Sequence, residues 1–190
     1  MAAIDTTRPS GALYKAAFLF YVLCGRRRSE VVSLYGRDIR EDEKKVTYKV
    51  RLKGGKTKWK VMPPPVWNAI QYYLYVTNRA LEDDKPVFVA TEKYKRRAET
   101  LIETRPLRGS TLFKAIKRYA KKAGIDPKKV SLHSLRHLGA ELFLNASEDI
   151  HKTQLFLDHA HLNTTQIYLS QLKGEEHNHW QQMANKLKVQ

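Results

Sequence analysis

The chain has 190 residues, 42% of them hydrophobic, which predicts one folded domain with a core of its own. Its formal net charge of +16 and its pI near 9.9 favour a polyanionic partner over a merely soluble surface. The sequence has no membrane-length apolar run and no signal peptide, so a membrane partner is not expected. Its one cysteine, Cys24, lies in an apolar stretch, so nothing indicates an oxidising compartment. We expect a cytoplasmic, intracellular protein.

The first half of the chain combines helical and alternating patterns. Residues 1–9 are expected to be flexible. Apolar residues recur at helical spacing in three further segments, which predicts helices at 10–24, 29–34 and 63–81. Residues 45–52 alternate between apolar and polar side chains, as a half-buried strand does. A glycine-containing turn follows, and residues 57–62 return as a second strand, which predicts a hairpin.

The second half is predicted to be mostly helical. Residues 87–90 suggest a third strand, and the polar, basic residues 91–108 suggest a loop. Apolar spacing predicts five more helices, at 110–124, 133–145, 149–157, 163–170 and 174–188. The predicted fold class is therefore α+β, mainly helical, with one small antiparallel β-sheet.

Groups suited to phosphate chemistry occur at intervals along this chain. They lie in Gly25-Arg26-Arg27-Arg28-Ser29-Glu30, His133-Ser134-Leu135-Arg136-His137, Leu157-Asp158-His159 and at Tyr168. Arginine binds two phosphate oxygens at once and keeps its proton, imidazole moves protons near neutral pH, and a phenol can act as a nucleophile. Together they are the groups needed to hold a phosphodiester and attack it without a metal.

In order and spacing these segments resemble the tyrosine recombinases, which include the phage integrases and their Xer relatives. The family's first box reads roughly T-G-L-R-x-S-E-L, its second H-x-L-R-H, and its third L-G-H followed by T-T-x-x-Y. The chain matches the first box at Gly25, Arg27, Ser29 and Glu30, and the second at every fixed position. It matches the third apart from Asp158 in place of glycine. The first box departs from the family at Arg26 and Arg28, where apolar residues are usual.

The resemblance implies a role for each matched residue. Tyr168 would attack the scissile phosphate and form a 3′-phosphotyrosine, while Arg27 and Arg136 would clamp the phosphate oxygens. His133 would take up the tyrosine proton or hold the phosphate, and His159 would hydrogen-bond the phosphate. Two further residues are expected to support these groups without contacting the phosphate themselves: Glu30, which would orient Arg27, and His137.

The family also uses a lysine in a β-hairpin turn as general acid for the 5′ leaving oxygen. The predicted hairpin offers Lys53, Lys56 and Lys58. Lys56, followed by Thr57 and later by Val61 and Pro63, is most similar to the family's pattern, and a shifted alignment would select Lys53 instead.

The resemblance further implies the fold, the partners and the setting of the chain. Residues 10–172 would form the catalytic domain of a DNA breaking-rejoining enzyme. Residues 173–190 are expected to form a C-terminal helix, and its apolar residues at helical spacing would either be exchanged onto a neighbouring subunit or pack on the chain's own domain. The implied partners are double-stranded DNA and further copies of the chain in a tetrameric synapse, with no metal, nucleotide or organic cofactor. The family usually has an N-terminal helical domain, so we expect a fragment, from a virus, plasmid or other mobile element.

Other interpretations remain open at this stage. A type IB topoisomerase shares the nucleophile and much of the pocket, and an inactive DNA-binding relative would share the fold. His133 and His137 lie four residues apart and could bind zinc, although no acidic third ligand is evident. Two groups of basic residues either face solvent or contact a DNA backbone: Lys114, Lys117, Arg118, Lys121 and Lys122, and Lys93, Lys95, Arg96 and Arg97.

Overall fold

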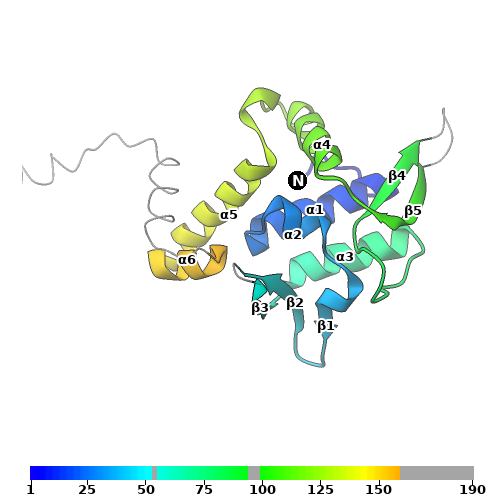
Figure 1. Ribbon diagram of the computed structural model, residues 1–190. Helices are drawn as coiled ribbons and strands as arrows, with labels where there is room; N and C mark the ends of the chain where they lie inside the picture. Colours follow the sequence, from blue (N-terminus) through cyan, green and yellow to red (C-terminus); the bar gives the residue numbers. More distant parts are fainter. Residues whose placement is uncertain (53–54, 94–98, 159–190) are drawn as a thin grey trace, which may run out of the picture. The chain divides into compact units, whose positions relative to one another are not determined.

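The computed structural model describes residues 1–52, 55–93 and 99–158 (Figure 1). The chain forms two compact units, Met1–Gly139 and Ala140–Gln190, that meet within one helix. The helices are α1 (Pro9–Cys24), α2 (Arg28–Val32), α3 (Pro64–Val76), α4 (Gly109–Lys122), α5 (Leu132–Ser147) and α6 (Ile150–Leu157). The strands are β1 (Ile39–Glu41), β2 (Val46–Arg51), β3 (Thr57–Val61), β4 (Val89–Lys93) and β5 (Glu99–Pro106). This α+β, mainly helical composition confirms the predicted fold class.

Helix α1 is the centre of the first unit. It begins at a proline, which suits the first helical position because that residue has no intrahelical partner for its N–H. Twelve of the 16 residues of α1 are buried, so the helix is covered on most sides. Ile4 is also buried in this core. The predicted helix at 10–24 is thus confirmed to within one residue at its start.

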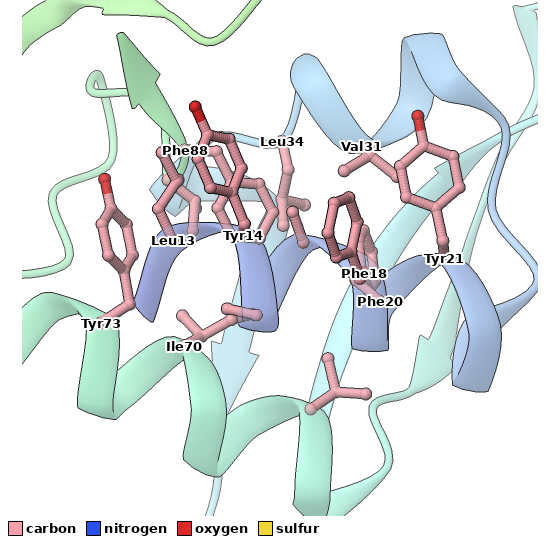
Figure 2. Close-up of a cluster of buried hydrophobic side chains, with 14 of the residues drawn as sticks. Leu13, Tyr14, Phe18, Phe20, Tyr21, Val31, Leu34, Ile70, Tyr73 and Phe88 are labelled. Atoms are coloured by element: carbon pink, nitrogen blue, oxygen red, sulfur yellow. The ribbon is translucent and has the colours of Figure 1, made fainter. Parts of the chain in front are cut away.

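Helix α3 packs along α1 (Figure 1). Figure 2 shows Ile70 and Tyr73 of α3 on the side that faces α1. The prediction that this helix continues to Leu81 is wrong, because it ends at Val76. Asn78, two residues later, has a left-handed φ of 50°, which a right-handed helix cannot accommodate.

The predicted hairpin is confirmed, and it gains a third strand. β2 pairs with β3, and β1 pairs with the other edge of β2, both antiparallel. Tyr48 and Val50 are buried, and the Tyr48 ring meets the ring of Phe20 in α1 edge-on, with centroids 5.1 Å apart. On the other face of the sheet the Arg40 guanidinium carbon lies 3.9 Å from the centroid of the Trp59 ring.

A second, two-stranded sheet corrects the predicted loop at 91–108. β4 extends to Lys93, and β5 returns antiparallel to it over Glu99–Pro106. The register shifts between Val89 and Ala90, which marks a bulge. The polar composition of this segment concealed the strand. A sequence pattern reveals a strand through alternating apolar residues, whereas β5 is defined by its backbone pairing with β4.

The second unit contains the C-terminal part of α5 and all of α6. Ala140 and Leu157 are fully buried in a small cluster, and the rings of Phe143 and Phe156 stack with centroids 4.5 Å apart. The predicted helix at 149–157 is confirmed as α6. The helices predicted at 163–170 and 174–188 lie outside the described residues. Within the described part, no helix has both the length and the apolar character that a bilayer span requires.

Candidate active site

The first arginine box lies in the turn between α1 and α2. Gly25 ends α1 with φ 60° and ψ 35°, a left-handed conformation that glycine adopts without steric cost. The backbone is extended at Arg27, with φ −78° and ψ 156°, and α2 begins at Arg28. The glycine of the box is thus needed to turn the chain so that the arginines follow directly after α1.

Glu30 ties this turn to α2. Its Oε2 accepts a hydrogen bond of 2.8 Å from the backbone N–H of Arg27, which caps the start of the helix. Its Oε1 lies 3.4 Å from Nη1 of Arg27. The Arg27 side chain is 47% exposed. The carboxylate therefore contacts Arg27 through both its backbone and its side chain, and the orienting role that the resemblance implies for Glu30 stays a prediction.

The two arginines that flank Arg27 are engaged elsewhere. Arg26 is buried, its Nε donates to the carbonyl oxygen of Cys24 at 2.6 Å, and its Nη1 lies 3.8 Å from Oε2 of Glu30. Arg28 runs along the start of α4, where its Cδ lies 2.6 Å from the position that a Cβ would take on Gly109. Among the three arginines, Arg27 alone is both exposed and held by the carboxylate of Glu30.

The second box occupies the first turns of α5, and a pair of serines fixes its start. The N–H of Ser134 donates to Oγ of Ser131 at 3.1 Å, and the N–H of Ser131 donates to Oγ of Ser134 at 3.0 Å. This reciprocal arrangement satisfies donors that a helix leaves free at its N-terminus, as a capping box does. The cap sets the rotation of the helix that carries His133, Arg136 and His137.

Arg136 joins the second box to the first. Its side chain is buried, and Nη1 donates to the carbonyl oxygen of Gly25, 111 residues earlier in the chain. Gly139 permits this approach: a Cβ there would lie 3.0 Å from the carbonyl carbon of Val22 in α1 and closer still to its oxygen. Sequence reasoning did not single out Gly139, although a residue without a side chain one turn after Arg136 was a usable sign of close helix packing.

His133 and His137 form an edge-to-face pair. Their ring centroids are 4.3 Å apart at an interplanar angle of 84°. Burial, followed by the charge of Arg136, lowers the pKa of His133. Burial, followed by His133 and Arg136, lowers the pKa of His137 to about 4. Both imidazoles are therefore neutral at pH 7, and a neutral imidazole can accept a proton.

The zinc interpretation of this histidine pair finds no support in the described part of the chain. No group of three or more His, Cys, Asp or Glu side chains there could hold a metal ion. A structural zinc site requires four ligands, and a catalytic site three.

The hairpin lysines occupy different environments. The carbonyl oxygen of Lys56 accepts a hydrogen bond of 2.7 Å from the N–H of Leu52, so Lys56 closes the turn, and its side chain is exposed. Lys58 pairs with Val50 in the sheet and is half-buried on the side of that buried residue. Lys53 lies outside the described residues. An exposed lysine in a turn is better able than Lys58 to reach a bound molecule.

The third box is described only at its start. Leu157 is fully buried at the end of α6, and Asp158 follows with φ 53° and ψ 42°. This left-handed conformation is the one that glycine favours, which explains why a glycine suits this position of the box. Aspartate tolerates it better than most residues do. His159 and Tyr168 lie outside the described residues.

The basic residues of α4 divide into two groups. Lys117 donates from Nζ to the carbonyl oxygen of Pro127 at 2.8 Å, and the Arg118 guanidinium lies 4.9 Å from the ring centroid of Tyr119. Lys114 and Lys121 are exposed. Part of this face therefore makes contacts within the chain, and part is open to a partner. The second basic group, Lys93, Lys95, Arg96 and Arg97, lies where side chains are not described.

Comparison with known proteins agrees with this geometry. Residues 1–175 match the sequence pattern of the phage integrase family. The chain belongs to this family. The match includes all three boxes, so the resemblance first noted in separate short motifs extends over most of the sequence.

Individual relatives are tyrosine recombinases. The chain is 32% identical over 170 residues to tyrosine recombinase XerD of Xanthomonas axonopodis pv. citri, an alignment that covers 88% of this chain and 54% of the relative. Among solved structures it is similar to XerA recombinase, with a TM-score of 0.67, 26% identity, and coverage of 99% of this chain and 61% of the other. The XerH recombinase bound to difH substrate has a TM-score of 0.66 at 22% identity, covering 85% of this chain and 43% of that one, and this likeness concerns the fold alone. The chain spans about half the length of the curated relatives it matches.

Proposed function

We propose that this chain is the catalytic part of a site-specific DNA recombinase, which cleaves and rejoins strands through a 3′-phosphotyrosine. The observation that carries the proposal is the hydrogen bond from Arg136 to the carbonyl oxygen of Gly25. It brings the second box against the turn of the first, beside Arg27. Membership of the phage integrase family supports the same chemistry.

In the proposed reaction Arg27 and Arg136 bind the non-bridging oxygens of the scissile phosphate, where negative charge accumulates in the transition state. Arg136 is 3% exposed, so the groups that cover it must move before a phosphate reaches its other N–H groups. His133, whose pKa is lowered, accepts the proton of the Tyr168 phenol as the phenolate oxygen attacks phosphorus. His159 donates a hydrogen bond to the phosphate.

Lys56 is the proposed general acid. Its ammonium group donates a proton to the 5′ oxygen as the bond from phosphorus to that oxygen breaks. Its place in the turn between β2 and β3 supports this role, because a long side chain on an exposed turn can reach into DNA bound across the site. The phosphotyrosine retains the energy of the broken bond, so rejoining needs no nucleotide cofactor.

The proposed partner is duplex DNA, bound mainly through its phosphates. The charge of +16 and the exposed lysines of α4 support this partner, and a related XerH recombinase has been crystallised with its difH substrate. We further propose that four copies assemble on paired DNA sites inside the cell, with residues 173–190 exchanged between neighbours, and that the protein serves a mobile element.

The test is a covalent trapping experiment. The 190-residue chain is incubated with nicked suicide duplexes that carry candidate target sites, so that the strand released by cleavage diffuses away and the adduct accumulates. We expect a protein–DNA adduct that survives denaturing gel electrophoresis. Peptide mass spectrometry should place the DNA on Tyr168.

The matched control is Tyr168→Phe, which removes one oxygen and little packing. This variant should bind DNA with unchanged affinity and form no adduct. An adduct on another tyrosine, or full cleavage by the Phe variant, would refute the assignment. If the chain relaxed supercoiled plasmid without any sequence preference, its function would be that of a topoisomerase and not of a site-specific recombinase.

A further inference from the structure

Arg26 occupies an unusual environment for a charged side chain. Only 1% of it is exposed, and its guanidinium carbon lies 5.8 Å from the centroid of the Tyr48 ring. Its Nε donates to the carbonyl oxygen of Cys24 at 2.6 Å. A buried cation is costly unless an anion or hydrogen-bond acceptors compensate it. Among the described residues, the carboxylate within ion-pair distance is that of Glu30, with Oε2 at 3.8 Å from Nη1.

The same carboxylate also holds Arg27. Oε2 accepts the backbone N–H of Arg27, and Oε1 lies 3.4 Å from its Nη1. Glu30 is therefore shared between a buried guanidinium and a half-exposed one. A carboxylate that already faces one cation attracts a second one less strongly, because its field is partly cancelled.

This sharing matters for phosphate binding. A phosphate that approaches Arg27 must compete with Glu30 for the guanidinium. The weaker the attraction between Glu30 and Arg27, the more readily the guanidinium turns to the phosphate. The backbone hydrogen bond from Arg27 does not depend on this balance, so the cap of α2 remains in place.

We propose that Arg26 is a positioning residue, whose buried guanidinium partly neutralises Glu30 and so leaves the Arg27 side chain available to the DNA phosphate. This inference rests on the proposed function. It concerns a residue that does not touch the DNA itself, because Arg26 is enclosed between the Cys24 carbonyl, Glu30 and Tyr48. It also gives a reason for an arginine at a position where the family pattern has an apolar residue.

The test compares four variants with the unaltered 190-residue chain: Arg26→Met, Arg26→Lys, Glu30→Gln and the double variant Arg26→Met/Glu30→Gln. Three quantities are measured for each: the single-turnover rate of adduct formation at saturating suicide DNA, the DNA affinity, and the melting temperature. Methionine keeps most of the volume of Arg26 without its charge, and lysine keeps the charge. Glutamine keeps an oxygen for the Arg27 N–H without the negative charge.

With Arg26→Met, the full charge of Glu30 acts on Arg27, and adduct formation should slow about ten-fold, which corresponds to about 1.4 kcal/mol. DNA affinity should stay within about two-fold, since most contacts with DNA are made elsewhere. Arg26→Lys should remain within about three-fold of the unaltered rate. The double variant should recover most of the rate, because no charge then holds Arg27, and it also removes both members of the buried pair, so it should fold.

A purely structural role for Arg26 makes different predictions. In that case the double variant would be no faster than Arg26→Met, because the lost packing would remain lost, and the inference would be overturned. It would also be overturned if Arg26→Met reacted at the unaltered rate, or if Arg26→Lys were as slow as Arg26→Met. If the unaltered chain forms no adduct, both the proposed function and this inference are refuted. A fast Arg26→Met variant refutes the inference alone.

Discussion

Replacing Gly139 by alanine should separate α5 from α1 and loosen the junction of the two arginine boxes. The new Cβ would lie 3.0 Å from the carbonyl carbon of Val22 and 3.2 Å from its Cα, and nearer still to its oxygen. These are backbone atoms, which cannot rotate away as a flexible side chain can. The helix must therefore shift, and Arg136 moves with it away from the carbonyl oxygen of Gly25.

The magnitude follows from three contributions. Overpacking a buried contact costs about 1–3 kcal/mol, and losing a buried hydrogen bond from a charged group costs about 1.5–3 kcal/mol. The better helix propensity of alanine returns about 1 kcal/mol. We expect a net loss of about 3 kcal/mol in the free energy of unfolding, which for a domain of this size lowers the melting temperature by about 6–12 °C.

Thermal and urea unfolding followed by circular dichroism measure this loss. Gly109→Ala is the matched control, because it also places a Cβ on a helical glycine but meets only the flexible side chain of Arg28. The control should stay within about 1 kcal/mol of the unaltered protein. If Gly139→Ala proved as stable as Gly109→Ala, the close approach of α5 to α1 would not be a property of the folded protein.

Three further predictions concern single side chains. Lys56→Ala should slow adduct formation at least about a hundred-fold, and a 5′-phosphorothiolate substrate should restore the rate because a thiolate leaves without a proton; rescue of Lys53→Ala in its place would move the general acid to that residue. Cys24 is buried and its pKa is raised to about 12, so a thiol reagent at pH 8 should label it only after denaturant is added, and rapid labelling of the folded protein would contradict the burial. The pKa of His137 falls from 6.5 to about 4 on folding, so the unfolded chain binds more protons between these two pH values. The free energy of unfolding should therefore decrease as the pH falls from 7 towards 4, by at most about 1.4 kcal/mol per pH unit for this group. Urea unfolding at several pH values should show a smaller decrease for His137→Gln, and equal decreases would exclude His137 as a source.

Sequence patterns predicted the elements whose residues repeat with a clear period. The apolar spacing of α1 and the alternation around Tyr48 and Val50 gave those elements nearly to the residue, because burial on one or more faces is written into such patterns. β1 has three residues, too few to show a period, and exists because it pairs with the edge of β2. β5 was missed for a related reason, since its strand depends on a partner and not on its own side chains.

The sequence named candidate groups for the site, but it did not indicate the contacts between segments that lie far apart in the chain. The resemblance to the family's motifs indicated Arg27, Glu30 and Arg136, and it also implied that Glu30 orients Arg27, the pair that the structure shows in contact. The burial of Arg26 could not be foreseen, because a run of three arginines carries no period and its central member matched the motif. The contact between Arg136 and Gly25 joins residues 111 positions apart, which only the packing of α5 on α1 determines.

Because Arg40 stacks on Trp59, the fluorescence of this tryptophan can report on the hairpin. Trp59 lies in β3, three residues after Lys56, with one guanidinium 3.9 Å and one ammonium, of Lys49, 6.0 Å from its ring centroid. The emission of an indole responds to charges and water at its face, so it changes when these cations turn towards another anion. The chain has three tryptophans, and phenylalanine at the other two positions, 67 and 180, would leave Trp59 as the sole fluorophore of its kind. Stopped-flow fluorescence of that variant would then time the hairpin's engagement with a polyanion without any attached dye.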